Sequence, residues 1–249
     1  MSIIEFISNN IPTFLALVGT GIFAGILAGL LGVGGGIVIV PVLFFLFQNF
    51  GVSSESAMLV ATATSLATIV PTSISSIRSH NQKGNVDFAL LKRWAVFILI
   101  GVMGGSWLVT RVDGTILTMM FGVIAVLSAL NMLFRTGKSA LYQKLPGKAG
   151  QAVMSTFIGF FSSMVGIGGG TISVPLLTLY SYPTHKAVGT AAAIGLIISL
   201  PATLTMLTLG STPSDAPAGT FGLVNLFGFL CIVPLTVLFA PVGVSLAVK

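Results

Sequence analysis

The sequence predicts an all-α, polytopic integral membrane protein built from two related halves, and three observations support this. Only 6% of its 249 residues are charged, 55% are hydrophobic, and the mean hydropathy is +1.07. A typical soluble domain has about 25% charged residues. Long stretches of the chain carry no charge, and one glycine-rich motif occurs twice. These stretches are long enough to cross a bilayer, because a spanning helix needs about 20 mostly apolar residues.

The uncharged stretches give the expected order of membrane spans. They cover residues 11–47, 57–77, 94–110, 114–134, 149–185, 187–214 and 216–248. The first of them holds 37 residues. At about 1.5 Å per residue, this permits two tight spans or one span plus a re-entrant half-helix. Both alternatives return the chain to the same side of the membrane, so the topology that follows is the same.

The glycine-rich motif divides the chain into two parts. Gly32–Leu43 and Gly166–Leu177 both follow the pattern G-[VI]-G-G-G-x-[IV]-x-V-P-[VL]-L. Shorter echoes follow in the same order: Ala61–Ala63 with Gly189–Ala191, Pro71 with Pro201, Gly84–Asp87 with Gly222–Asn225, and Gly104–Ser106 with Gly243–Ser245. Repeated halves are typical of secondary transporters.

We therefore expect one membrane domain with a first repeat over 1–137 and a second repeat over 138–249. After its last echo, the first repeat continues through the apolar stretch 116–134, whereas the second stops at Lys249. The final helix of the second repeat is thus expected to be absent.

Basic residues concentrate in segments 78–93 and 135–148, which we assign to the cytoplasm because Lys and Arg favour that side. The N-terminus, the Arg111–Gly114 turn and the loop 210–220 then lie outside. The first half begins outside and the second begins inside, so the repeats are expected to have inverted topology. The net charge of +6 is explained by these loops, and no nucleic-acid partner is expected.

The two glycine runs are the main candidate for a substrate site: Gly34, Gly35, Gly36, Gly168, Gly169 and Gly170. Glycines weaken a helix, so each run is expected to break it before a short half-helix. The first turn of a helix has unpaired N–H groups and a positive dipole end, which favour an anion. Inverted repeats would bring two such ends toward the bilayer midplane. The alternative is that the glycines only allow close helix packing.

Hydroxyl-rich helices follow the glycine runs, and hydroxyls can bind an oxyanion without a buried charge. Thr62, Ser65 and Thr190 are the candidates, although such groups also often bond to carbonyls of their own helix. The central spans contain no Asp, Glu, Lys or Arg. Cation-coupled transporters commonly use a buried carboxylate, so this composition favours an anion. Arg78 and His80 are candidates for a basic mouth that attracts anions; the alternative for Arg78 is a positive-inside anchor.

Several function classes lack their sequence signatures. The chain has no H-E-x-x-H, G-x-S-x-G or G-x-x-x-x-G-K-[ST] motif and no close carboxylate pair, so we expect neither an enzyme nor a nucleotide-driven pump. Cys231 is the only cysteine, which excludes an intrachain disulfide. No catalytic residue, metal site or cofactor is expected.

The doubled motif, the Ala61–Ser65 stretch and the Gly84–Asp87 turn resemble the sulfite exporter TauE/SafE family, also called TSUP membrane transporter proteins. The resemblance covers roughly residues 10 to 248 and departs at the end, where members usually have an eighth span. It implies a multi-pass permease of the plasma membrane (the bacterial-type inner membrane). The implied substrate is a sulfur-containing anion such as sulfite or an organosulfonate.

These observations together predict a secondary transporter for a small anion, whose partners are the substrate and the lipid bilayer. A coupling ion and an oligomeric state are left open. Two other hypotheses remain at this point: a selective anion channel, and a non-transporting membrane subunit of a partner complex.

Overall fold

The computed structural model describes residues 11–134 and 142–247, which form an α-helical bundle with one short hairpin. The helices in this part of the chain are α2 (Ile11–Leu31), α3 (Gly36–Asn49), α4 (Ser54–Gln82), α5 (Phe88–Val109), α6 (Gly114–Phe134), α7 (Lys148–Val165), α8 (Gly170–Leu179), α9 (Thr184–Thr208) and α10 (Leu226–Ala247). Strands β1 (Thr220–Phe221) and β2 (Val224–Asn225) pair antiparallel just before α10. Helices α2, α4, α5, α6, α9 and α10 are long and apolar enough to cross a membrane.

Each glycine run separates a long helix from a short one. Helix α2 has 21 residues and α3 has 14, whereas α7 has 18 and α8 has 10. At about 1.5 Å per residue, α3 and α8 are shorter than the roughly 30 Å hydrocarbon core. Of the two alternatives expected for these stretches, the structure therefore has the long helix followed by a short one. Pro41 and Pro175 are each the sixth residue of their short helix.

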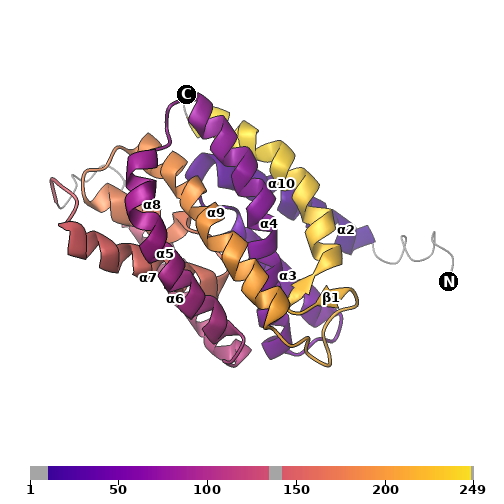
Figure 1. The fold of residues 1–249 in the computed structure, drawn as a ribbon. Coiled ribbons are helices and arrows are strands. Elements are labelled where there is room, and N and C mark those ends of the chain that lie inside the picture. Colours follow the sequence, from indigo (N-terminus) through magenta and orange to yellow (C-terminus); the bar gives the residue numbers. More distant parts are fainter. Residues whose placement is uncertain (1–10, 135–141, 248–249) are drawn as a thin grey trace.

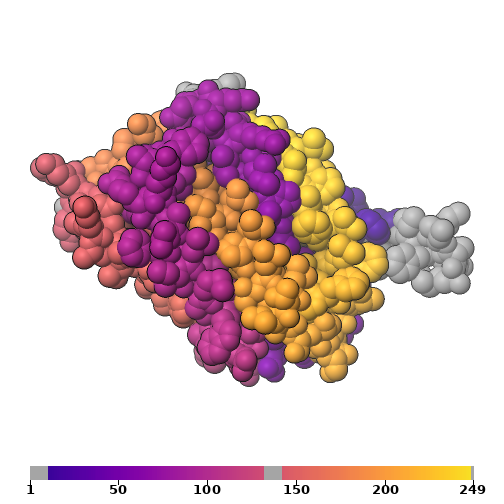
Figure 2. Space-filling view, viewed as in Figure 1, coloured from indigo at the N-terminus to yellow at the C-terminus, as the bar shows by residue number. Residues whose placement is uncertain are grey.

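Helices α4 and α9 pack against each other in the middle of the bundle (Figure 1), and most of their side chains are buried. Helix α10 packs along α2 on one flank, and α5 packs along α7 on the other. In Figure 2, side chains of α9 reach the visible face between those of α5 and α10. Large apolar side chains such as Val96, Met119 and Leu238 point outward, as expected of surfaces that face lipid.

The two flanks are held by matching close contacts. A β-carbon at Gly243 of α10 would lie 2.0 Å from the Ile26 carbonyl oxygen of α2, and one at Gly105 of α5 would lie 2.4 Å from that of Phe160 of α7. The offset between Gly84–Asp87 and Gly222–Asn225 carries Gly105 onto Gly243, one residue away from the Gly104 that the sequence echo aligns with Gly243. Ile26 and Phe160 have the same spacing as the glycine-rich motifs. The packing therefore repeats with the two halves exchanged, through small residues that let helices approach closely.

Candidate functional site

Both glycine runs form tight turns at the start of a short helix. Gly34 and Gly35 have φ values of 76° and 83°, and Gly168 has 68°, in the left-handed region that favours glycine. Gly35 and Gly169 are the N-caps of α3 and α8, and neither helix has a side-chain cap. The first amides of both helices are thus left without a capping side chain, which is the arrangement that an anion site requires.

The two turns cross in direct backbone contact. A β-carbon at Gly36 would lie 2.4 Å from the Gly166 carbonyl oxygen, and one at Gly170 would lie 2.1 Å from that of Gly32. The contacts are reciprocal, so the N-terminus of α3 lies against the second turn and that of α8 against the first. Of the six glycines that the sequence singles out, Gly36, Gly168 and Gly170 contact the opposite turn, whereas Gly34, Gly35 and Gly169 lie against α4, α2 and α9. The contact brings the positive ends of two helix dipoles together.

The three hydroxyls chosen from the sequence have different surroundings. Ser65 Oγ donates to the Gly166 carbonyl oxygen at 2.7 Å, and Thr190 Oγ1 accepts the Asp87 backbone N–H at 3.0 Å. Thr62 is buried, and its Oγ1 has no hydrogen-bond partner among the described residues. Ser65 and Thr190 therefore position backbone, whereas the Thr62 hydroxyl is unengaged.

Two joints between the halves were not selected as functional from the sequence. At the start of α5, the Asp87 N–H donates to Thr190 Oγ1 of α9. At the start of α10, the Asn225 N–H donates to Thr64 Oγ1 of α4 at 2.8 Å. Asp87 Oδ1 also accepts the Leu90 N–H, and Asn225 Oδ1 accepts the Gly228 N–H, so each of these residues caps the helix that it begins. Thr190 and Thr64 therefore hold equivalent positions in the two joints, whereas the sequence echo aligns Thr190 with Thr62, two residues earlier.

The Asp87 joint also contains a phenol. Tyr182 Oη donates to Asp87 Oδ2 at 2.5 Å. This hydrogen bond lowers the pKa of the Asp87 carboxyl below its usual value, with a smaller contribution from Lys186. Burial and the neighbouring carboxylate raise the pKa of Tyr182. Asp87 is the one carboxylate of this joint among the described residues. Elsewhere in the described ranges, no group of three His, Cys, Asp or Glu residues is placed to bind a metal ion.

The two access candidates lie in different environments. Arg78 is exposed and borders a groove of about 410 Å³ between α4 and α10. His80 is 1% exposed, and its Nε2 lies 2.9 Å from the Gly29 carbonyl oxygen of α2. A buried imidazole cannot line a solvent-facing mouth, so this corrects the expectation for His80. The electrostatic role of Arg78 stays a prediction.

Further buried hydroxyls have no hydrogen-bond partner in the part of the chain that the structure describes: Ser73, Ser162, Thr171, Ser173, Ser199 and Thr203. A buried polar group without a partner typically costs about 1–3 kcal/mol and therefore calls for an explanation. Sequence pattern could not single these residues out, because a helical Ser usually bonds to its own helix, as Ser106 Oγ does to the Val102 carbonyl oxygen at 2.7 Å.

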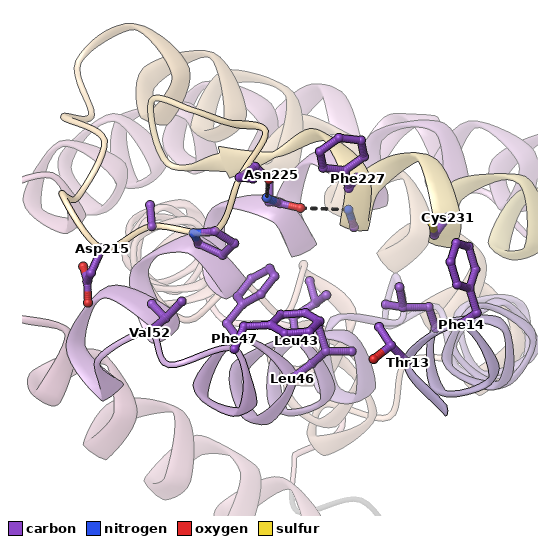
Figure 3. Close-up of a pocket in the computed structure, with 16 residues that line it drawn as sticks. Thr13, Phe14, Leu43, Leu46, Phe47, Val52, Asp215, Asn225, Phe227 and Cys231 are labelled. Atoms are coloured by element: carbon purple, nitrogen blue, oxygen red, sulfur yellow. Dashed lines mark hydrogen bonds between the residues drawn. The ribbon is translucent and has the colours of Figure 1, made fainter. Parts of the chain in front are cut away.

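A cavity of about 510 Å³ lies between α2, α3, α10 and the loop that precedes α10 (Figure 3). Apolar side chains such as Phe14 and Phe47 line it, and its described lining includes no glycine of either turn. Asp215 borders the cavity and accepts the Ser53 N–H at 2.8 Å. Hydrogen bonds from Ser56 and Ser53 lower the pKa of Asp215 to about 2. This carboxylate fastens the loop to the start of α4.

Comparisons with known proteins agree with this architecture. A family model described as "Sulfite exporter TauE/SafE" matches residues 17–249. A "Probable membrane transporter protein" of Haemophilus influenzae is 31% identical over 229 residues, which are 92% of this chain and 87% of the relative. Similar proteins occur in Methanocaldococcus jannaschii (29% identical, 87% of this chain and 77% of the relative) and Bacillus subtilis (27%, 76% and 76%). No solved structure matches the chain significantly.

Proposed function

Because the chain belongs to the sulfite exporter TauE/SafE family, we propose that it is a secondary transporter for a small anion. Membership makes it a multi-pass membrane transporter and not an enzyme. The proposed substrate is a sulfur-containing oxyanion such as sulfite or an organosulfonate, and the proposed location is the plasma membrane.

The crossing of the two glycine turns is the observation that carries this proposal. It gathers the N-termini of α3 and α8 inside the bundle, where first-turn amides without a capping side chain and helix dipoles favour negative charge. None of the Asp, Glu, Lys or Arg residues in the described ranges is buried. An anion would therefore meet neutral donors at this crossing, whereas a cation would meet no buried carboxylate.

Reciprocal packing supports an inverted repeat with α3 and α8 as re-entrant half-helices. The contact of Ser53 with Asp215 and the close approach of Gly114 to Glu55 join one set of loops. The contacts of Asp87 with Tyr182 and Lys83 with Val244 join the other set. The second set carries most of the basic residues: Arg78, Lys83, Lys92, Arg93, Lys144, Lys148 and Lys186.

The positive-inside rule then assigns the basic end to the cytoplasm. The N-terminal residues 1–10 and residues 135–141 of the second basic segment lie outside the described residues. The described ends can be tested instead. In a Cys231→Ser background, a cysteine at Ser211 should react with an impermeant maleimide added outside cells, and a cysteine at Gln82 should react only after permeabilisation. The reverse pattern would overturn the assigned orientation.

Alternating access would work by rocking the α2–α10 flank and the α5–α7 flank around the crossing. Each flank joins one helix of each half, and the Asp87 and Asn225 joints tie the helix starts of one half to the central helix of the other. A rocking motion would therefore open one end of the bundle while it closes the other, with the anion held at the turns.

The proposal is tested with purified protein in liposomes. Sulfite and methanesulfonate should each be carried with saturable kinetics, and flux should depend on the gradient of a coupling ion or counter-anion. Protein-free liposomes are the control. Large single-channel currents would identify a channel instead, and the absence of flux together with a stoichiometric co-purifying protein would identify a subunit of a complex.

A further inference from the structure

Ile69 of α4 lies between the two glycine turns. Its Cγ2 would be 3.0 Å from a β-carbon at Gly34, and its Cδ1 would be 3.3 Å from one at Gly168. The Ile69 side chain is buried and therefore fills the space on the α4 side of the crossing. An anion has no room there while this side chain is in place.

The equivalent position on α9 has no side chain. Thr64 and Thr190 are equivalent in the two joints. Counting five residues onward along α4 and α9 makes Ile69 equivalent to Gly195. A second pair of contacts gives the same correspondence between α4 and α9. A β-carbon at Gly166 would lie 2.9 Å from the Thr62 carbonyl oxygen of α4, and one at Gly32 would lie 2.3 Å from the Val188 carbonyl oxygen of α9. The two sides of the crossing therefore differ by a whole isoleucine side chain.

The same spacing pairs Ser73 with Ser199, each one helical turn beyond Ile69 or Gly195. Both serines are buried, at 1% and 0% exposure, and neither hydroxyl has a hydrogen-bond partner among the described residues. The Ser73 Oγ would lie 3.1 Å from a β-carbon at Gly195, and the Gly169 amide nitrogen and Ile69 Cγ2 would each lie 3.9 Å from the same point. The N-cap of α8 and the Ser73 hydroxyl thus converge on Gly195.

The geometry points to a substrate subsite on the α9 side of the crossing, in which the Ser73 and Ser199 hydroxyls and the Gly169 amide bind one oxyanion beside Gly195, where no side chain of α9 intervenes. This inference deepens the proposed function and rests on it. The donors are neutral, so they suit a small oxyanion that does not need a cationic partner. Because Ile69 fills the equivalent space on α4, the transporter has one such subsite and not two.

Gly195→Ala is the sharpest test, because its effects on binding and on folding have opposite signs. The added methyl group fills the space and displaces the Ser73 hydroxyl, whereas alanine is a better helix former than glycine. We expect the Kd for sulfite from thermal shift, and the KM for sulfite flux in liposomes, to rise at least ten-fold. The Tm of the ligand-free protein should not fall.

Gly122→Ala is the matched control, since a β-carbon there meets nothing within 4 Å on helix α6. It should keep the wild-type Kd and KM. Ser73→Ala and Ser199→Ala provide a second test. Each removes a buried hydroxyl that has no partner, so the Tm should hold or rise while sulfite binding weakens about ten-fold. Ser106→Ala is their control, because its hydroxyl bonds to its own helix.

The outcomes separate the two proposals. If wild-type protein carries sulfite or methanesulfonate while Gly195→Ala and both serine variants keep its Kd and KM, the subsite is overturned and the proposed function stands. If wild-type protein neither binds nor carries these anions, the proposed function falls and the subsite falls with it.

Discussion

The Asp87 joint and the Asn225 joint make the same backbone contacts with different chemistry. In each, the N–H of a helix cap donates to a threonine of the opposite half. Asp87 is an ionisable carboxylate that accepts from Tyr182, whereas Asn225 is a buried neutral amide that donates to the Ala218 carbonyl oxygen at 3.0 Å.

This difference separates what the two halves share from what each has specialised. The shared part is backbone geometry: a cap, a threonine acceptor and a crossing of glycine turns. The side chains around it differ: only the Asp87 joint contains an ionisable cap, and the position that Ile69 occupies on α4 is Gly195 on α9. Four tests show how far this division holds.

The largest effect is expected at the shared crossing. Gly36→Ala and Gly170→Ala would each press a β-carbon into the backbone of the opposite turn, at 2.4 Å and 2.1 Å. Overpacking of this kind should cost about 3 kcal/mol or more in either half. Detergent-solubilised variants, monitored by size-exclusion chromatography and thermal unfolding, should lose the folded peak in both cases. A folded, active Gly170→Ala protein would show that the turns do not touch.

A smaller loss is expected when the chemistry of one joint is exchanged for that of the other. Asn225→Asp turns a buried donor into a carboxylate that faces the Ala218 carbonyl oxygen. We expect about 2–4 kcal/mol of destabilisation at pH 7, relieved as the carboxyl is protonated at lower pH. Asp87→Asn is the matched exchange and should cost less than half as much, since amides also cap helices well. Equal losses would mean that the joints are chemically interchangeable.

The third test removes the threonine acceptors that both joints share. Thr64→Val and Thr190→Val each leave a backbone N–H without its partner, at a cost of about 1–3 kcal/mol. Because the contact is reciprocal, the two losses in free energy of unfolding should agree within about 1 kcal/mol. Thr208→Val serves as a control, because that exposed hydroxyl bonds to its own helix. A neutral effect at only one joint would break the symmetry.

The smallest effect concerns pH. The Tyr182 hydrogen bond lowers the pKa of Asp87 in the folded state, so it stabilises the protein fully above the unfolded pKa of about 4 and progressively less as pH falls below it. Tyr182→Phe should reduce stability at pH 7 by less than about 1 kcal/mol, since Asp87 is partly solvated. The acid limb of a Tm-against-pH profile should become shallower. An unchanged profile would show that the phenol does not bind the carboxylate.

The sequence could predict the features of this protein that depend on local properties. Uncharged stretches located the six long apolar helices, whereas the stretch 149–185 holds α7 and α8, which are not among those six. The doubled glycine run located both turns, because helix breaking depends on the residues themselves. The matching Gly84–Asp87 and Gly222–Asn225 segments lie at the two joints, although a sequence repeat by itself does not reveal which residues they contact. Loop charges predict the proposed orientation in the same local way, and the cysteine-labelling experiment tests it.

The sequence could not predict which hydroxyls stay unpaired or which positions of α4 and α9 are equivalent. The sequence echoes align Thr62 with Thr190, whereas the hydrogen bonds of the two joints make Thr64 the equivalent of Thr190. This correspondence also makes Ile69 the equivalent of Gly195. The burial of His80 was likewise invisible near a span end.

The sequence alone determined an all-α membrane protein of two similar halves, because apolar content and glycine breaks act within a few residues of the chain. Only the tertiary structure decided which turn meets which and which buried hydroxyls are left without a partner in the described residues. The physical reason is that hydrogen-bond satisfaction and free volume depend on groups more than a hundred residues apart in the chain, such as Ser65 and Gly166, which meet only when the bundle packs.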